Sequence, residues 1–378
     1  MKRYSTAIAL GFLALAAPGL TRAAPAQSRN LDFYWIDVEG GASTLIVSPS
    51  GESMLFDTGY EVGDRDAKRI YAAAQQAGLK QIDYVVISHY HFDHIGCIPD
   101  VLQQATVQRD VLDRGQSYPG ATYQSYLTAV GGHRKTAVVG GTVQLDAGSP
   151  NPVVITVVAV NGAGVTTTNE NDLSLAVTVA FGAFRAEIGG DLSGDNTANY
   201  KDIETGVAPQ VGPIDVYKVH HHCSSHSTND AWLATTKPAV GIISTGVGND
   251  YSHPTADCLE RLHKGGVKTY WTETGNGVAP EAGLDVVGGN IVVEVTPGAG
   301  TYTVKPSQGS EDTYPLAGGT PPAPASNPAP KFAWSRNSSV YHFATCSFVN
   351  NISPQNLRNG DSAPDGKTLH KNCPVGSH

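Results

Sequence analysis

The sequence has few charged side chains for its length and no excess of basic ones. Of its 378 residues, 16 % are charged, and 25 Lys and Arg stand against 34 Asp and Glu, which gives a formal net charge of −9. This balance excludes a protein that grips nucleic acid through a basic surface over the whole molecule. A local site is not excluded, because a bound metal ion supplies positive charge that composition does not count. Hydrophobic residues reach 40 %, which excludes a wholly disordered chain.

Apolar runs long enough to cross a membrane are absent after the N-terminal segment. One early run covers residues 7–17, behind the basic pair Lys2 and Arg3 and before small residues typical of a cleavage site. It is shorter than the roughly 18 apolar residues that a membrane helix needs, and no later segment reaches that length. Residues 1–23 are therefore predicted to be a Sec-type signal peptide. The remaining chain is expected to be secreted or periplasmic, without a transmembrane segment.

Cysteines are scarce, and their number is odd. There are five, and all follow the predicted signal peptide: Cys97, Cys223, Cys258, Cys346 and Cys373. An odd number leaves at least one thiol unpaired in a monomer, and the absence of any CxxC pair argues against a structural zinc finger. Cys346 and Cys373 lie in one short C-terminal segment and are the predicted disulfide, since the compartment is expected to be oxidising. Cys223 is expected to be a packed thiol rather than a metal ligand.

Short apolar segments alternate with turns over residues 31–305. The 42 glycines and 23 prolines favour many turns and short strands over a helical bundle. Strands are expected at 31–38, 82–88 and 215–219, among others, and a helix at 64–77. Strands that occur both in runs and in alternation with helices predict a layered α/β domain.

The composition changes after residue 305. Residues 306–330 are rich in Pro and Gly, so they are predicted to be an extended linker. Residues 331–378 contain five Lys and Arg against two Asp and Glu, together with two cysteines. They are predicted to form a small basic tail, which is expected to bind nucleic acid or an envelope polymer.

Seven of the 13 histidines lie in two short runs, and the first run reads as a metal site. It consists of His89, His91, Asp93 and His94, directly after the strand expected at 82–88. Alternation places His89 and His91 on one side, and the following turn brings Asp93 and His94 round to the same place. Imidazole and carboxylate ligands in this combination suit zinc or manganese.

The second run follows the strand expected at 215–219 and contains His220, His221, His222 and His226. Three consecutive histidines cannot all face one ion. His222 is the expected ligand and His221 the expected neighbour facing substrate, although the reverse assignment stays open. His220 and His226 are expected to be ordinary loop residues.

The first run, His89-x-His91-x-Asp93-His94, resembles the signature of the metallo-β-lactamase superfamily. The resemblance implies a four-layer αβ/βα sandwich that holds one or two metal ions at one edge of its sheets. Asp57, in an Asp-Thr-Gly segment, matches a residue that supports the metal ligands from behind. Asp191, in a Gly-Gly-Asp segment, matches the carboxylate that lies between two metal ions.

A narrower resemblance rests on segments around Asp172, Asp191, His222 and His253 in that order. Together they resemble the ComEC-like branch, the nuclease-like domain of DNA-uptake proteins, over about residues 31–305. Many relatives carry a third histidine for the first metal, but His133 stands at the wrong place for it. Asn171 or Asp172 is expected to fill that corner, with Asp172 taken as the ligand. Because His253 precedes a proline and is held extended, it is expected to contact phosphate or donate a proton.

These resemblances imply a secreted metal-dependent hydrolase, most readily a phosphodiesterase or nuclease acting on DNA. Two divalent ions are implied, with zinc favoured and manganese as the alternative. They would be held by His89, His91, Asp93, His94, Asp172, Asp191 and His222. His221 and His253 are expected to act on the substrate, and Asp57 to support the site. The alternatives are other hydrolases on the same scaffold, namely a choline-phosphate esterase, a lactonase or a β-lactamase, because a fold does not specify a substrate.

Overall fold

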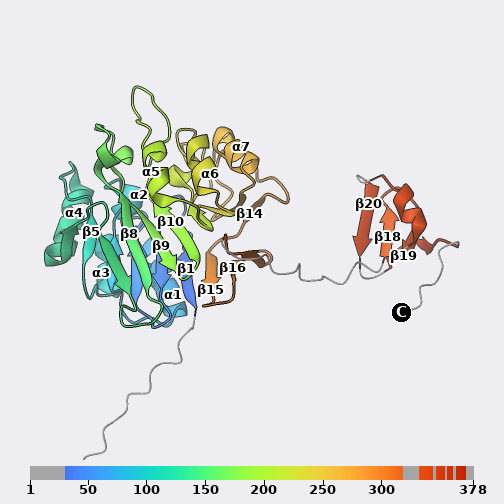
Figure 1. Ribbon diagram of the computed structural model, residues 1–378, viewed down its shortest axis with the longest axis horizontal. Coiled ribbons are helices and arrows are strands. Elements are labelled where there is room, and N and C mark those ends of the chain that lie inside the picture. Colours follow the sequence, from blue (N-terminus) through green and yellow to red (C-terminus); the bar gives the residue numbers. More distant parts are fainter. Residues whose placement is uncertain (1–29, 318–331, 344–345, 354–355, 361–362, 372–378) are drawn as a thin grey trace, which may run out of the picture.

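The computed structural model describes residues 30–317, 332–343, 346–353, 356–360 and 363–371 (Figure 1). The predicted signal peptide, residues 1–23, lies outside the described residues. Among the residues that are described, no helix combines the length and the apolar character needed to cross a bilayer.

Two large β-sheets form the centre of the structure. The first has nine strands in the order β17-β16-β15-β1-β2-β3-β4-β5-β6, in which the pairs from β3 to β6 are parallel and the others antiparallel. Its strands are β1 (Leu31–Trp35), β2 (Thr44–Val47), β3 (Ser53–Phe56), β4 (Tyr84–Val86), β5 (Val111–Asp113), β6 (Arg134–Thr136), β15 (Ile291–Val295), β16 (Thr301–Pro306) and β17 (Asp312–Pro315).

The second sheet has eight strands in the order β14-β13-β12-β11-β10-β9-β8-β7, and the pairs from β10 to β14 are parallel. Its strands are β7 (Thr142–Leu145), β8 (Val153–Ala159), β9 (Ala176–Phe181), β10 (Phe184–Gly189), β11 (Val216–Lys218), β12 (Val240–Ile243), β13 (Lys268–Trp271) and β14 (Asp285–Val287).

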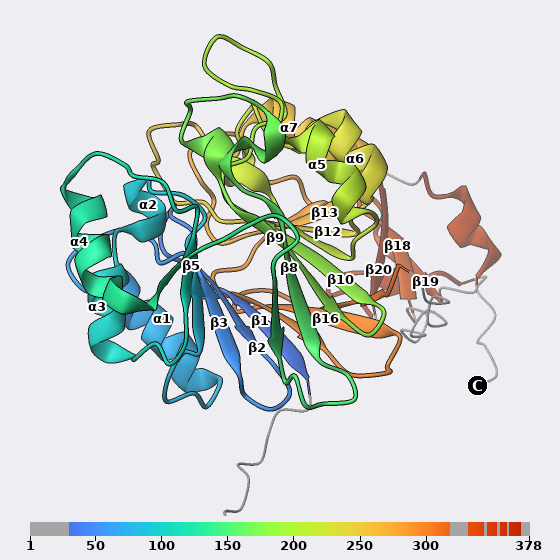
Figure 2. The same cartoon turned by 60° about the vertical axis from the view of Figure 1, so that its left-hand side comes forward.

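Helices cover the outer face of each sheet (Figure 2). The first sheet is covered by α1 (Arg65–Gln76), α2 (Phe92–Ile95), α3 (Ile98–Gln104) and α4 (Ala121–Val130). The second is covered by α5 (Glu204–Val211), α6 (Asp230–Thr236) and α7 (Ala256–Lys264). Helix α1 matches the expected 64–77 closely, because Ala67, Ile70 and Ala74 provide an apolar stripe at helical spacing.

The alternation of side chains along the strands explains the layers. On β2 and β3, Leu45 and Leu55 point to the helices, whereas Ile46 and Met54 point to the core between the sheets. Phe184 of β10 joins that central core from the opposite sheet. The predicted four-layer αβ/βα sandwich is therefore confirmed.

The predicted boundary of this body at residue 305 is wrong. Strand β17 pairs with β16 along the edge of the first sheet, and Asp312 Oδ2 accepts hydrogen bonds from Lys268 Nζ (2.9 Å) and Tyr270 OH (2.5 Å). Leu316 is buried in the core between the sheets, and Ala317 N donates to Asp215 Oδ1. The composition of residues 306–330 as a whole is that of a linker, and it does not reveal a strand of only four residues beside the Pro-rich part. The remainder of the predicted linker, residues 318–330, lies outside the described residues.

The cysteines correct a second prediction. Cys223 is joined to Cys258 in a disulfide, with Cα atoms 5.5 Å apart, and is therefore not a packed thiol. The loop that carries Cys223 returns to the start of α7, where the backbone N–H and the hydroxyl of Thr255 both donate to the Cys223 carbonyl. Cys97 is a buried free thiol. Cys346 is disulfide-bonded, while its predicted partner Cys373 lies outside the described residues.

The C-terminal segment has its own four-stranded sheet in the order β20-β18-β19-β21. The strands are β18 (Phe332–Ser335), β19 (Val340–Phe343), β20 (Leu357–Gly360) and β21 (Thr368–Leu369). In the part of the chain that the structure describes, these strands pair only with one another. Its independence from the body stays a prediction.

We expect a chain truncated after Ala317 to melt cooperatively with a midpoint close to that of the full chain. A chain truncated after Lys305 loses β17 and exposes the site of Leu316, so we expect its free energy of unfolding to fall by about 3 kcal/mol. Urea unfolding of the three chains measures both effects. Equal stability of the two truncated chains would contradict the place of β17 in the body, and loss of cooperativity after truncation at Ala317 would contradict a separate tail.

Candidate active site

The predicted site residues lie on loops that leave the carboxyl ends of parallel strands. His89, His91, Asp93 and His94 follow β4 of the first sheet, whereas Asp191 follows β10 and His222 follows β11 of the second. Carboxyl ends of parallel strands share one edge of a sheet, which is where open α/β sheets place their ligands. The loops of both sheets together line a cleft of about 370 Å³.

Four side chains at the floor of this cleft converge as a metal-binding group. Each of Asp93, His94, Asp191 and His222 offers one ligand atom, and these atoms all lie within 4.8 Å of one another. His94 Nε2 is 3.4 Å from Asp191 Oδ1, and His222 Nε2 is 3.4 Å from Asp93 Oδ2. His94 Nε2, His222 Nε2 and Asp191 Oδ1 are all buried without a hydrogen-bond partner. Since buried polar atoms are normally satisfied, this donor set fits a divalent metal ion.

Neighbouring groups aim both imidazoles into the cleft. His94 Nδ1 lies 2.7 Å from Asp57 Oδ2, and Asp57 is itself held by the backbone N–H and hydroxyl of Ser88, both at 2.7 Å. His222 Nδ1 donates to the Ser244 carbonyl at 2.8 Å. In each ring the Nδ1 proton is engaged, so Nε2 is left as the ligand atom. Asp57 thus lies behind His94, in the supporting position that the sequence suggested.

The carboxylates of this metal-binding group favour a positive charge beside them. Burial alone would lower the pKa of His94, but the carboxylates of Asp191, Asp93 and Asp57 outweigh it and hold that pKa well above its usual value. Burial would raise the pKa of Asp191, yet His94 and His222 hold it well below its usual range. Both carboxylates in the cleft therefore stay ionised, and a divalent cation that displaces the His94 proton meets the same need.

A second set of imidazoles faces the other oxygen of Asp191. His89 Nε2 lies 3.0 Å from His91 Nδ1 and 3.8 Å from Asp191 Oδ2. His221 Nε2 lies at the same distance, 3.8 Å, from that oxygen, and His222 Nε2 of the first group is also close to it, at 3.7 Å. Burial and the neighbouring His94 hold the pKa of His89 well below its usual value, so the ring is neutral, as a metal ligand must be. Asp191 thus lies between two groups of potential ligands.

The corner that lacks a third histidine is occupied by Asn171. Asn171 lines the cleft, and its Nδ2 lies 3.2 Å from His221 Nε2. Asp172 instead accepts hydrogen bonds from Thr167 Oγ1 (2.7 Å) and Lys201 N (2.9 Å) and is not among the residues that line the cleft. The other oxygen of Asp172, Oδ1, is buried without a hydrogen-bond partner, so its assignment as a metal ligand stays a prediction. His133 bonds the Arg109 carbonyl away from the cleft.

The turn that carries His221 and His222 has an unusual backbone. His221, His222 and Cys223 have φ values of 49°, 53° and 62°, the left-handed region that residues with a Cβ rarely adopt. Three such residues in succession persist only where the surrounding structure holds them. The Cys223–Cys258 disulfide and the bonds from Thr255 hold one end of this turn.

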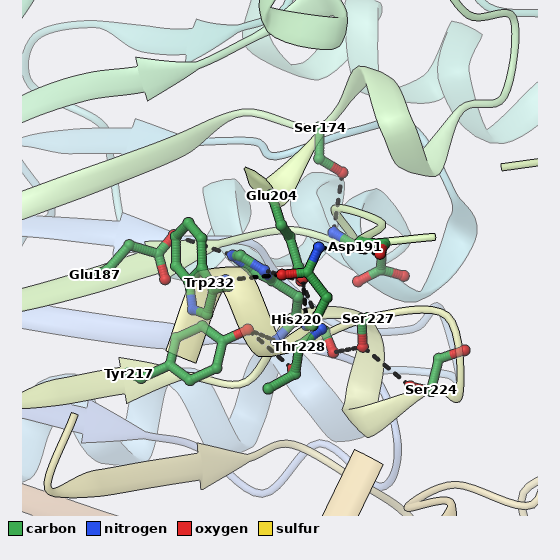
Figure 3. Close-up of polar contacts among 12 residues, drawn as sticks. Ser174, Glu187, Asp191, Glu204, Tyr217, His220, Ser224, Ser227, Thr228 and Trp232 are labelled. Carbon is green, nitrogen blue, oxygen red and sulfur yellow. Dashed lines mark hydrogen bonds and ion pairs between the residues drawn. The ribbon is translucent and has the colours of Figure 1, made fainter. Parts of the chain in front are cut away.

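His220 holds the other end and is not the ordinary loop residue that was predicted (Figure 3). Its ring is fully buried, with Nδ1 2.8 Å from Glu204 Oε1 and Nε2 3.2 Å from Glu187 Oε1. Burial opposes the charged ring, but the two glutamates outweigh it and raise the pKa of His220 to about 9. Glu204 also accepts from the backbone N–H groups of Thr228 and Asn229. A glutamate inside the apolar strand β10 was the one sequence signal for this network.

We expect replacement of His220 by leucine to lower the free energy of unfolding by about 3–5 kcal/mol, because two buried carboxylates lose their partner. His226 belongs to the same histidine run but forms a half-exposed pair with Asp195. We therefore expect His226→Ala to cost less than about 1 kcal/mol. Urea unfolding of both variants in the presence of a chelator separates this effect from metal binding. Equal costs for the two variants would contradict the buried network.

Comparisons with known proteins agree with this geometry. Residues 36–173 match the profile of the metallo-beta-lactamase superfamily. Recombination protein 2 of Haemophilus influenzae is 29 % identical over 231 residues, which cover 61 % of this chain and 26 % of that protein. ComE operon protein 3 of Bacillus subtilis is 23 % identical over 273 residues, which cover 66 % of this chain and 33 % of that protein. This chain thus spans about a quarter to a third of the length of these two relatives.

Among solved structures, the metallo-beta-lactamase fold protein YhfI from Bacillus subtilis is similar with a TM-score of 0.40 and 15 % identity, over 66 % of this chain and 99 % of that one. The sheet order, the ligand motif after β4 and the profile match lead to one conclusion. The chain has a metallo-β-lactamase domain, whose profile matches residues 36–173, and it is similar over part of its length to recombination protein 2 and ComE operon protein 3.

Proposed function

We propose that this protein is a secreted phosphodiesterase that acts on nucleic acid and uses two divalent metal ions, for which zinc is the favoured identity. The observation that carries the proposal is the position of Asp191, whose carboxylate lies among imidazoles from both sheets. His94 Nε2 is 3.4 Å from its Oδ1, and His89 Nε2 and His222 Nε2 are 3.8 Å and 3.7 Å from its Oδ2. A carboxylate between two cations offsets their mutual repulsion. When bound, such a pair of ions supplies an activated water and charge for the phosphoryl oxygens.

The chain supplies two sets of ligands for this purpose. His89 Nε2 and His91 Nδ1 would hold the first ion, with Asp172 or Asn171 at the adjoining corner. Asp93, His94 and His222 would hold the second ion. Imidazole and carboxylate together, without a thiolate, suit zinc and also admit manganese.

His221 and His253 face the space where substrate would lie. Their rings are 5.6 Å apart, and both residues line the cleft. Burial outweighs the opposing carboxylate of Asp191 and, together with His222, lowers the pKa of His221 to about 4. Burial, together with His222 and His221, lowers the pKa of His253 to about 3. The rings are therefore neutral near pH 7, so they contact a phosphoryl oxygen through hydrogen bonds rather than through a permanent charge.

Nucleic acid is the favoured substrate because one relative is named a recombination protein and matches over 61 % of this chain. The rival hydrolases share the fold, so only the site can separate them. A β-lactamase or lactonase site of the usual three-histidine kind is disfavoured because His133 bonds the Arg109 carbonyl and does not reach the cleft. A choline-phosphate esterase remains the alternative. The tail is proposed to add affinity for nucleic acid or an envelope polymer.

We expect Asp191→Asn to reduce bound metal below two ions per chain and to lower the rate of phosphodiester hydrolysis by at least about a hundredfold. The amide keeps the shape of the side chain but removes the charge between the two ligand sets. Metal content by elemental analysis and hydrolysis of bis(4-nitrophenyl) phosphate measure the two effects. Full occupancy with a near-normal rate would refute the binuclear site.

His253→Ala is expected to keep both metal ions while slowing hydrolysis by about ten- to a hundredfold, because its ring faces substrate rather than metal. His133→Ala serves as the matched control, since it removes a histidine that lies outside the cleft, and should change neither quantity. Loss of metal from His133→Ala would restore a three-histidine site and favour the lactamase or lactonase alternative.

A further inference from the structure

The mouth of the cleft is aromatic. Four rings line it, those of Tyr60, Phe92, Tyr200 and Tyr251. Phe92 and Tyr251 are 53 % and 65 % exposed, which is unusual for such large side chains. Phe92 stands within the metal motif itself, between His91 and Asp93. Because more than half of each of these two side chains is exposed, both are available to a substrate.

Each exposed ring is backed by a second ring. Phe92 lies against Tyr60 with centroids 5.2 Å apart, and Tyr251 stacks on His253 at 5.7 Å with an interplanar angle of 24°. The supporting ring fixes the orientation of the exposed one, so that less conformational freedom is lost when a ligand stacks on it. Tyr200 similarly stacks on His226 at 4.5 Å. These pairs form separate platforms around the floor of the cleft.

Basic side chains are missing from the same surface. None of the residues that line the cleft, all of which the structure describes, is a lysine or an arginine. Contacts from cationic side chains to several phosphates, which dominate the binding of duplex DNA, are therefore not available there. Affinity has to come from the metal ions at the scissile phosphate and from the aromatic rings around it.

The depth of the ligand group limits what can reach it. His94, Asp191 and His222 are 0 %, 3 % and 6 % exposed, so a phosphodiester has to enter the cleft to meet them. Bases inside a duplex are paired and stacked on each other, so they are not free to stack on an aromatic side chain beside the cleft. Base stacking on aromatic side chains is the usual means of holding a single strand.

We propose that Phe92 and Tyr251 stack on unpaired bases next to the scissile phosphate, which makes single-stranded nucleic acid the substrate class of this cleft. The proposal rests on the phosphodiesterase function proposed above. It adds the two residues that determine specificity and the strand state of the substrate.

The test compares two esters with the same leaving group on the metal-loaded full chain. Thymidine 5′-(4-nitrophenyl phosphate) carries a base, and methyl 4-nitrophenyl phosphate does not. We expect kcat/KM to be about tenfold higher for the thymidine ester, as one stacked base implies. Phe92→Leu or Tyr251→Leu should reduce this ratio several-fold. Val138→Ala, which alters an exposed apolar residue of the body outside the cleft, should leave the ratio unchanged.

A ratio near one in the unaltered protein, or a ratio unchanged in both cleft variants, would overturn the proposal. Faster hydrolysis of choline 4-nitrophenyl phosphate than of the thymidine ester would also overturn it, because the rings would then bind a quaternary ammonium group.

A binding measurement separates this proposal from the phosphodiesterase function. Fluorescence anisotropy with a labelled oligothymidylate and with the corresponding duplex, in a chelator, requires no hydrolysis. We expect the single strand to bind more tightly than the duplex, and Tyr251→Leu to weaken it by about tenfold. If this holds while no ester is hydrolysed, the phosphodiesterase function fails and base stacking stands. If the duplex binds as well, or if neither cleft variant matters, base stacking fails.

Discussion

The structure around the site depends on one constraint, the burial of ionised carboxylates that need positive charge. Asp57 and Asp191, which are buried, and Asp93, which is partly exposed, gather around the buried His94. Without compensation, their burial would be costly. Histidines from both sheets meet this need, and His94 and His222 are each oriented by a partner on Nδ1. The same charge balance makes the cleft a place where divalent ions bind.

The loop that supplies His221 and His222 is held by two independent restraints. A disulfide joins Cys223 to α7, and the ion triad of His220 with Glu187 and Glu204 joins the other end to β10 and α5. Together they hold a left-handed turn whose conformation is unfavourable for residues with a Cβ. The residues with this unfavourable conformation follow β11, where the chain has to turn so that the imidazoles point into the cleft.

The chemistry of the cleft changes with depth. Its floor is ionic and buried, whereas its mouth is aromatic, exposed and free of basic side chains. A substrate therefore meets aromatic surface first and charge last. This order favours molecules whose reacting phosphate is flanked by planar groups over polymers recognised by backbone charge alone.

The sequence by itself determined the fold class and the metal motif, because both are carried by local patterns. Apolar alternation indicates the strands, and four metal-capable side chains within six residues after one strand indicate the ligand loop. The supporting place of Asp57 came from a motif resemblance, and the geometry agrees with it.

Only the tertiary structure decided the features that depend on distant segments meeting. It placed Asn171 rather than Asp172 in the cleft, buried His220 between Glu187 and Glu204, and paired Cys223 with Cys258. It also extended the body to β17, whose four residues lie beside a Pro-rich segment. Most of these contacts join residues that are far apart in the chain. Asn171 and Asp172 are neighbours in the chain, but they make different contacts. Residue type and spacing do not specify such contacts, because the direction of a side chain follows from the packed backbone.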